Sequence, residues 1–359
     1  MVLRQSHISF ALACLLACLE WSCAEKSSAD PCCSFTALPP ASSVQDGYGL
    51  LRVTGSTAAT YSASDPTGVA YGPAKLNETL KLPPGRYTLS INASRHVIDI
   101  VEAREARCTT GTLMVTGHTG ERYEVADSTG HTASEVLGAA MSLFPGSYRI
   151  AVNNTYASLE VKQGQWTEIR TGTLLVEGTT GETYYVLDSR NRQLAQSTLG
   201  RPLAFLPGRY PVKVNNTSIT AEIFAGHTSE YRTGNIVVKG LTDELYYVRD
   251  TVGRNLNYQS LNKPLAFLPG HFVVTVNNTA MPARVAPDST SAFETGSLVL
   301  TGAGPEYYYV IDESGRELNY SSFNRPLSLF PSDYTVKLGN TLRKATVKPG
   351  ASTSLEAFH

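Results

Sequence analysis

Hydrophobic and polar positions alternate with a period of two over most of this chain. Between residues 170 and 231, for example, apolar side chains recur at Leu174 and Val176 and again at Tyr184 and Val186. A period of two is typical of a strand with one buried face, and Val, Ile, Leu, Tyr and Thr, which dominate these stretches, are mostly strand formers. No stretch has a sustained helical period. The pattern therefore predicts an all-β protein built from short strands.

Markers of this pattern repeat at steps of 61 or 62 residues. A glycine closes the first strand of each repeat, an aspartate ends the second strand, and a Pro-Gly or Pro-Ser pair follows. The pairs begin at Pro84, Pro145, Pro207, Pro269 and Pro331. A fixed period of this length indicates a repeat architecture. The predicted modules are residues 47–108 (divergent), 109–169, 170–231, 232–294 and 295–359.

Each module of about 62 residues holds six or seven expected strands, with turn signals every 8 to 12 residues. This favours a small antiparallel β-sandwich. A unit of this size buries only about 60% of its unfolded surface, so neighbouring modules are expected to support one another. Because few residues join the last strand of one module to the first strand of the next, we expect an elongated, stiff rod.

The second strand of each module has one face that recurs and one that varies. Tyr184 and Val186 have identical counterparts in three other modules, which indicates the buried face. On the varying face, five tyrosines gather at equivalent or neighbouring positions: Tyr185, Tyr247, Tyr309, Tyr258 and Tyr320. Aromatic rows can stack on sugars or on a partner surface, but tyrosines also pack in cross-strand pairs. Both interpretations remain open, and packing is the simpler one.

Recurrent acidic residues begin a turn after the second strand, at Asp127, Asp188, Asp250 and Asp312. Asp in the first position is typical of a type I turn, whose carboxylate accepts hydrogen bonds from backbone N–H groups. A calcium site is the alternative. However, each turn offers one recurrent carboxylate, whereas calcium takes six to eight oxygen ligands. The turns are therefore predicted to be structural.

A Pro-Gly turn and an Asn-Asn turn are expected in each module. Pro207-Gly208 and Pro269-Gly270 are predicted to join two paired strands in a tight hairpin, with glycine at positive φ. Asn215-Asn216 suits the left-handed positions of a two-residue hairpin turn. The Asn-Asn-Thr triplets are also formal glycosylation sequons, but turn chemistry alone explains why they recur.

The chain begins with a segment typical of a secretory signal, residues 1–24. Residues Leu15 to Cys18, 'LLAC', resemble a bacterial lipobox, in which Cys18 would carry the lipid. Cleavage after Ala24 without lipidation is the alternative. Residues 25–46, rich in Ser, Ala and Pro, are predicted to be a flexible tether. A disulfide from Cys32 or Cys33 to Cys108 could clamp this leader to the first module, as exported proteins allow.

The module pattern resembles the PEGA-type surface-layer repeat and related Ig-like or prealbumin-like modules of bacterial exported proteins. In one copy the residues that carry this resemblance are Pro202, Leu203, Pro207, Gly208, Tyr210, Val212, Val214 and Gly226. The likeness covers most of residues 47–359. It departs in a longer 'YYVxDxxGRxL' hairpin and in 'RPL' or 'KPL' where threonine-proline is common. The resemblance implies a noncatalytic module of the envelope or cell surface.

Composition and motifs exclude several function classes. A net charge of −1 with 42% hydrophobic residues does not fit a basic nucleic-acid binder. The seven histidines do not recur between modules, and no catalytic, phosphate-binding or metal-ligand spacing is present. We therefore expect no enzyme activity, no cofactor and no metal. The sequence predicts an exported structural or interaction protein, lipid-anchored in the cell envelope or else secreted or periplasmic. Its partner would be an envelope protein or a glycan, and a glycan-binding array using the outer tyrosines is the alternative.

Overall fold

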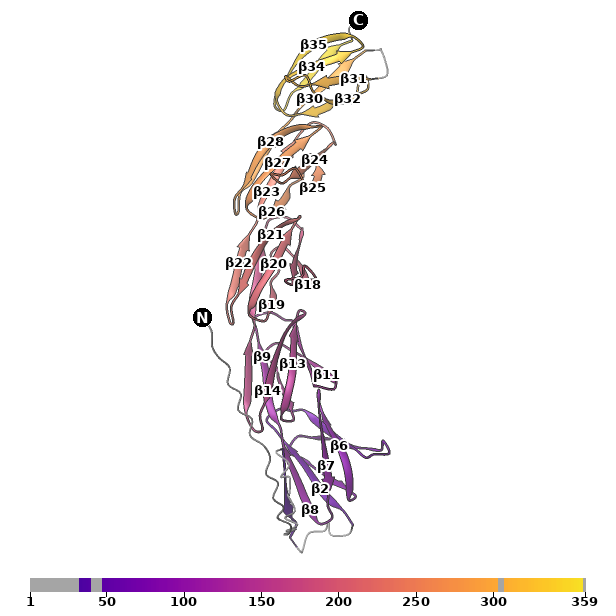
Figure 1. The fold of residues 1–359 in the computed structure, drawn as a ribbon, viewed down its shortest axis with the longest axis vertical. Coiled ribbons are helices and arrows are strands. Elements are labelled where there is room, and N and C mark those ends of the chain that lie inside the picture. Colours follow the sequence, from indigo (N-terminus) through magenta and orange to yellow (C-terminus); the bar gives the residue numbers. More distant parts are fainter. Residues whose placement is uncertain (1–31, 40–46, 303–306, 358–359) are drawn as a thin grey trace, which may run out of the picture.

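The computed structural model describes residues 32–39, 47–302 and 307–357. These residues form 36 strands, and none of them lies in a helix. Five modules of seven strands each follow one another along the long axis of the molecule, from indigo to yellow in Figure 1. One additional strand, β1 (Cys33–Ala37), precedes module 1. The predicted all-β rod of tandem sandwich modules is confirmed.

Module 1 contains β2 (Gly49–Thr54), β3 (Thr60–Ser64), β4 (Ala70–Lys75), β5 (Thr79–Leu82), β6 (Gly85–Ile91), β7 (Ser94–Ile100) and β8 (Arg104–Thr109). Module 2 contains β9 (Gly111–Thr116), β10 (Arg122–Ala126), β11 (Thr132–Val136), β12 (Ala140–Leu143), β13 (Gly146–Val152), β14 (Thr155–Val161) and β15 (Trp166–Arg170). Module 3 contains β16 (Gly172–Glu177), β17 (Thr183–Leu187), β18 (Gln193–Thr198), β19 (Leu203–Phe205), β20 (Gly208–Val214), β21 (Thr217–Ile223) and β22 (Thr228–Arg232). Module 4 contains β23 (Gly234–Lys239), β24 (Leu245–Arg249), β25 (Asn255–Ser260), β26 (Leu265–Phe267), β27 (Gly270–Val276), β28 (Thr279–Val285) and β29 (Thr290–Glu294). Module 5 contains β30 (Gly296–Thr301), β31 (Tyr308–Ile311), β32 (Glu317–Ser321), β33 (Leu327–Leu329), β34 (Ser332–Leu338), β35 (Thr341–Val347) and β36 (Ser352–Glu356).

Each module consists of two sheets with the same strand order. In module 4 one sheet has the order β26-β23-β29 and the other the order β25-β24-β27-β28. The first strand pairs antiparallel with the fourth but parallel with the seventh. The smaller sheet is therefore mixed, not purely antiparallel as expected, because the seventh strand returns to the first sheet in the direction of the first strand.

The core of each module lies between its two sheets around one tyrosine of the second strand. Tyr246 is fully buried, and its hydroxyl donates to the carbonyl groups of Ile236 (3.0 Å) and Lys263 (2.8 Å). Its counterparts are buried to the same degree: Tyr61, Tyr123, Tyr184 and Tyr308. Burial raises the pKa of the Tyr61 and Tyr123 hydroxyls to about 12. The predicted inward face of the second strand is confirmed.

The structure corrects the interpretation of the Pro-Gly pairs. Strands β19 and β20 flank Pro207-Gly208 but belong to different sheets, so the pair is a crossing between sheets and not a hairpin turn. Neither Gly208 nor Gly270 has a positive φ. Glycine fits this position because it has no Cβ. A Cβ at Gly208 would lie 2.9 Å from the hydroxyl of Tyr210, whose ring packs over it. The paired hairpin is β20–β21, and its turn residues Asn215 and Asn216 have φ values of 45° and 62°.

The leader segment is also different from the expected tether where it is described. Strand β1 pairs antiparallel with β8 along its whole length, and Cys33 forms a disulfide with Cys108. The prediction of a flexible tether is therefore wrong for residues 33–37, because main-chain pairing and a covalent bond hold them to module 1. The signal segment 1–24 and Cys18 lie outside the described residues. The part of the chain that is described offers no helical segment suited to crossing a membrane.

Candidate functional site at the module joints

A single residue links each module to the next. Thr233 lies between β22 and β23 and is buried, and both its N–H and its hydroxyl donate to the carbonyl oxygen of Glu177 (2.9 and 3.0 Å). The other three joints have the same residue type with the same two bonds: Thr110, Thr171 and Thr295. Such a short link, fixed by two hydrogen bonds, leaves little freedom for bending.

The loop between the fourth and fifth strands of each later module inserts one side chain into the core of the module before it. Phe330 of module 5 is buried and packs in the core of module 4, where its ring lies 6.2 Å from that of Phe293. Three other buried residues pack in the same way in the core of the module before their own. They are Phe144 of module 2, Leu206 of module 3 and Leu268 of module 4. We call these four residues the plugs. Each core therefore includes a residue of the following module.

The Asn-Asn-Thr turns of modules 2 to 4 each bond to the following module, beside or at its plug. Asn277 donates from its side-chain amide to the carbonyl oxygen of Ser328 (2.9 Å), and Asn278 donates to that of Leu318 (2.6 Å). The hydroxyl of Thr279 accepts from the N–H of the plug residue Phe330 (3.1 Å). The turns of modules 2 and 3 make the same bonds. The recurrent triplet is therefore both a hairpin turn and an intermodule contact.

A glutamate bridges the two modules at the same place. Glu244 accepts from the side-chain amide of Asn277 (2.9 Å) and from the N–H of Ser328 (2.7 Å). Glu182 and Glu121 occupy the same position in the preceding joints. Glu244 is half-buried, and its two donors come from both modules. The joint therefore favours one relative orientation.

A tyrosine secures the plug loop from within its own module. The hydroxyl of Tyr210 donates to the carbonyl oxygen of the plug residue Leu206 (2.7 Å), and Tyr148 and Tyr334 make the same bond to Phe144 and Phe330. Module 4 has Phe272 at this position and lacks the bond. The plug is thus held at its main chain as well as by its side chain.

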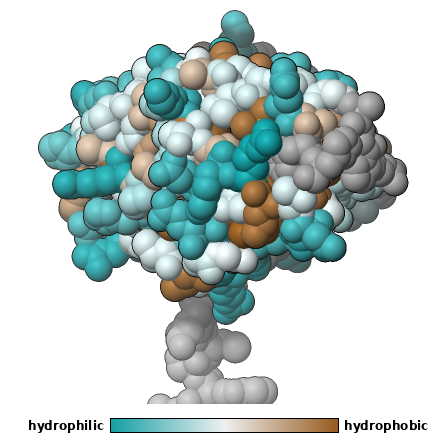
Figure 2. Space-filling model, turned by 90° about the horizontal axis from the view of Figure 1, so that it is seen from above, coloured by the Kyte–Doolittle hydropathy of each residue, from teal (hydrophilic) through white to brown (hydrophobic). Residues whose placement is uncertain are grey.

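Module 5 differs from the other modules at the turn between β34 and β35. Gly339 stands where the other modules have the first asparagine of the turn, and it is exposed together with Asn340. Leu338, the last residue of β34, is nevertheless only 6% exposed. Figure 2, which looks onto this end of module 5, shows mainly hydrophilic and neutral residues with small separate hydrophobic areas. This end differs in chemistry from the internal joints.

The five outer tyrosines are placed by the structure on the four-stranded sheets. Tyr247 pairs across the strands with Tyr258, with ring centroids 5.6 Å apart, and Tyr309 pairs with Tyr320 at 6.0 Å. Tyr185 is opposite Gln196 and has no aromatic partner across the strand. The exposed rings are Tyr185, Tyr258 and Tyr320, whereas Tyr247 and Tyr309 are half-buried. The outer tyrosines of modules 4 and 5 therefore pack in cross-strand pairs within their own modules.

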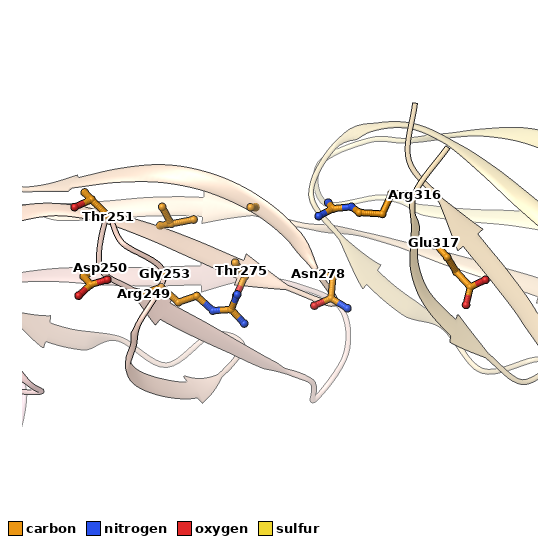
Figure 3. A pocket seen from close by; sticks show the side chains of 10 residues that line it. Arg249, Asp250, Thr251, Gly253, Thr275, Asn278, Arg316 and Glu317 are labelled. Carbon is orange, nitrogen blue, oxygen red and sulfur yellow. The ribbon is translucent and has the colours of Figure 1, made fainter. Parts of the chain in front are cut away.

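A shallow groove of about 460 Å³ crosses the joint between modules 4 and 5. Figure 3 shows Arg249, Thr275 and Asn278 on the module 4 side and Arg316 on the module 5 side. Both arginines already have partners, because Arg249 donates to Asn255 (2.8 Å) and Arg316 to Asp312 (3.1 Å). A second groove beside it is lined by Tyr247 and several asparagines. These walls offer amide, guanidinium and aromatic groups.

The recurrent aspartates lie at exposed turns, and their hydrogen bonds are made within those turns. Asp188 accepts from the N–H groups of Arg190 (2.8 Å) and Arg192 (2.9 Å), and its second oxygen accepts from the Arg192 guanidinium (2.7 Å). These donors lower the pKa of the carboxyl group. Asp127, Asp250 and Asp312 have equivalent backbone donors. Each carboxylate thus stabilises its own turn.

Comparison with known proteins gives limited information. No family model matches the chain, and no curated protein matches it. Similar solved structures include the Bacillus anthracis TIE protein, with 11% identity, 68% of this chain and 67% of that chain covered, and a TM-score of 0.16. The major pilin subunit BcpA of Bacillus cereus has 11% identity, 87% and 98% coverage, and a TM-score of 0.17. The minor pilin GBS52 of Streptococcus agalactiae has 10% identity, 52% and 94% coverage, and a TM-score of 0.14. These values are too low to carry an argument about function, and the resemblance to PEGA-type repeats stays a prediction.

The sequence analysis missed the plugs and the bridging glutamates. A signal for both was present: an aromatic or leucine residue precedes the recurrent proline in modules 2 to 5, and a glutamate precedes the core tyrosine by two positions in modules 2 to 5. Module 1 has Pro83 and Ala59 at these places. A residue type that recurs in all copies except a terminal one is a candidate for a contact between modules.

Proposed function

We propose that this protein is a noncatalytic structural rod of the cell envelope, which holds its distal module at a fixed distance from its amino-terminal attachment. The observation that carries the proposal is the joint, where a plug, an Asn-Asn-Thr turn and a bridging glutamate fix neighbouring modules together. A protein that only needed five independent binding modules would have no use for the three joints that contain all of these contacts. These joints make the array of modules stiff.

The attachment proposed for the rod is the amino terminus. If Cys18 is lipidated, the protein is a membrane-anchored lipoprotein, and cleavage after Ala24 instead gives a secreted or periplasmic rod. Replacement of Cys18 by Ser separates these cases. Loss of fatty-acid labelling and release from the membrane fraction support the anchor, whereas an amino terminus at Glu25 in the unmodified protein supports simple secretion.

Small-angle X-ray scattering tests the rod itself. A single compact domain of this size has a radius of gyration of about 20 Å, and we expect a value well above this together with the scattering of a stiff, narrow particle. The double variant Asn215→Ala/Thr217→Val should bend at the joint between modules 3 and 4. The matched control is Asn340→Ala/Thr341→Val at the β34–β35 turn of module 5, which should scatter like the wild type. A compact wild-type particle near 20 Å contradicts the proposal.

A second candidate function is glycan binding near the joint of modules 4 and 5. The observation that favours it is the groove in which Tyr247 lies beside the asparagine side chains of Asn255 and Asn319, since aromatic and amide groups together suit a polar, ring-shaped ligand. Retention on insoluble polysaccharide or peptidoglycan should be lost in Tyr247→Ala/Tyr309→Ala. It should persist in Tyr156→Ala, which removes an exposed tyrosine of module 2. If the wild type is not retained, this candidate fails while the rod proposal stands.

A further inference from the structure

Three side chains with metal-binding chemistry meet beside the first joint, and a fourth is bonded to one of them. Cys32 and Cys33 lie at the start of β1, Cys108 lies in β8, and His96 lies in β7. The sulfur atoms of Cys32 and Cys33 and a ring nitrogen of His96 are within 4.8 Å of one another, and Cys33 is bonded to Cys108. Spacing along the chain gave no metal-ligand pattern, because the pairing of β1 with β8 is what places Cys33 against module 1, where His96 of β7 lies close by.

The geometry allows both adjacent cysteines to face one site. Successive residues of a strand point to opposite faces, which would normally separate two neighbouring cysteines. Cys32 precedes the first residue of β1 and is not bound by this alternation. Its thiol lies 3.8 Å from the carbonyl oxygen of Thr109, the last residue of β8. The sulfur atoms of Cys32 and Cys33 and a ring nitrogen of His96 are therefore neighbours, and Cys108 is joined to them through its bond to Cys33.

The surroundings cover most of the site, with Cys33 and His96 half-buried. Cys32 and Cys108 are 3% and 0% exposed, and the ring of His96 lies 5.5 Å from that of the plug residue Phe144. The carbonyl oxygen of Cys32 accepts from the side chain of Gln163 in module 2 (3.2 Å). A closed position with ligands from several segments is typical of structural metal sites and not of catalytic ones.

Three thiolates and one imidazole make a common ligand set for structural zinc, with Zn–S near 2.3 Å and Zn–N near 2.0–2.1 Å. Ligand atoms at these distances lie roughly 3.3–3.8 Å apart on a tetrahedron. The ligand atoms of Cys32, Cys33 and His96 lie within 4.8 Å of one another and need only small shifts, whereas the sulfur of Cys108 has to move after its bond to Cys33 is broken. We propose that Cys32, Cys33, Cys108 and His96 bind a zinc-like divalent cation when the disulfide is reduced. The disulfide and the metal site are alternative states of the same side chains.

Electrons and protons balance when the disulfide form is converted into the cation-bound form. Two equivalents of a thiol reductant supply two electrons and two protons, which break the Cys33–Cys108 bond and leave two thiols, while the reductant becomes a disulfide. Binding of the cation then releases one proton from each of the three cysteine thiols, and His96 contributes a neutral ring nitrogen. In the reverse direction a small-molecule disulfide takes two electrons from the Cys33 and Cys108 thiolates and two protons from solvent, is itself reduced to two thiols, and the re-formed Cys33–Cys108 bond expels the cation. Strand β1 is thus clamped to β8 in both states, by the disulfide in one and by the cation in the other.

Cobalt spectroscopy on the full chain tests the site, with Cys14, Cys18 and Cys23 replaced by Ser to remove other thiols. The reduced protein should bind one equivalent of Co²⁺ with thiolate-to-metal charge-transfer absorption, Zn²⁺ should displace it, and the oxidised protein should show neither. Cys32→Ser and His96→Ala should each weaken binding by more than the roughly 10–100-fold that loss of an outer-shell partner costs. His131→Ala, which alters a half-buried histidine of module 2, is the control.

Two outcomes overturn the proposal. One is a reduced protein without charge-transfer bands, and the other is binding that Cys32→Ser and His96→Ala leave as tight as in the control. Because Cys32 and His96 are outside the disulfide, both variants can be checked for native folding in the oxidised state by circular dichroism before reduction. A failure to bind is then not a failure to fold, and it leaves the proposed rod function untouched.

Discussion

Module 1 and the four later modules have the same core but different joint residues. Tyr61 and Leu82 of module 1 are buried like their later counterparts Tyr246 and Phe267. At the plug position, however, module 1 has Pro83, which is half-buried and has no N–H to donate. Lys81 stands where the later modules have Ser or Ala. Module 1 therefore keeps the residues that build a sandwich and lacks the plug and the bridging glutamate, although Asn92 and Ser94 of its turn still bond to module 2.

This difference separates two kinds of recurrence in one repeat. Residues present in all five copies, such as the core tyrosine, stabilise the module that contains them. Residues present in all copies but one serve a neighbour: the plug is missing from module 1, and the first asparagine of the turn is missing from module 5. In a linear array, stability is the sum of module and interface contributions, so each kind can be perturbed without the other.

Truncation of a plug should give the largest effect. Phe330→Ala removes a buried ring from the core of module 4 although the residue belongs to module 5. Loss of a buried phenylalanine costs about 3–5 kcal/mol, and calorimetry should show that module 4 and not only module 5 melts earlier. Pro83→Ala at the equivalent position of module 1 is the control and should change little. Equal effects of the two variants would show that the plug does not support its neighbour.

Removal of an intermodule hydrogen bond should have a smaller effect. Asn277→Ala leaves the carbonyl oxygen of Ser328 and a carboxylate oxygen of Glu244 without this donor. An unsatisfied buried acceptor costs about 1–3 kcal/mol, which should appear as weaker coupling between the unfolding of modules 4 and 5. Asn340→Ala removes an exposed asparagine at the β34–β35 turn of module 5 and should stay within about 0.5 kcal/mol of the wild type. If Asn277→Ala and Asn340→Ala have the same unfolding transition, the hydrogen bonds of Asn277 do not stabilise the joint.

Alkaline pH should weaken the modules through their core tyrosines. The pKa of Tyr123 is raised to about 12 by burial, while an unfolded tyrosine titrates near 10. A raised pKa means that the stabilisation is complete below pH 10 and is lost as pH rises toward 12, by roughly 1 kcal/mol per pH unit for each tyrosine. Tyr123→Phe should therefore flatten the alkaline decline in unfolding free energy. The exposed Tyr156→Phe should leave it unchanged, and an identical decline in all three proteins would contradict the prediction.

The sequence predicted what repeats within a module better than what connects modules. Period-two alternation identified the buried Tyr184 face because one module is enough to create that burial. The Asn-Asn turn was also correct as a turn, because left-handed φ is a local property. Its bonds to the next module depend on how two modules meet, and nothing local to Asn277 reports that. Strand β1 was missed for the same reason, since its partner β8 is distant in the chain.

Gly208 gives the smallest expected effect and tests the corrected turn. A hairpin turn with glycine at positive φ would make Gly208→Ala costly, because residues with a Cβ rarely adopt that conformation. In the structure its φ is not positive, and a new Cβ would meet only the end of the Tyr210 side chain, at 2.9 Å from the hydroxyl. Module 5 already has Ser332 at this position, followed by Tyr334 with its bond to the plug carbonyl intact. We therefore expect a loss of about 1 kcal/mol or less, caused by a shift of the Tyr210 ring, when unfolding is followed by calorimetry. Gly200→Ala is the matched comparison, since Gly200 has a φ of 81°, and it should lose more. A larger loss in Gly208→Ala than in Gly200→Ala would restore the tight-turn interpretation.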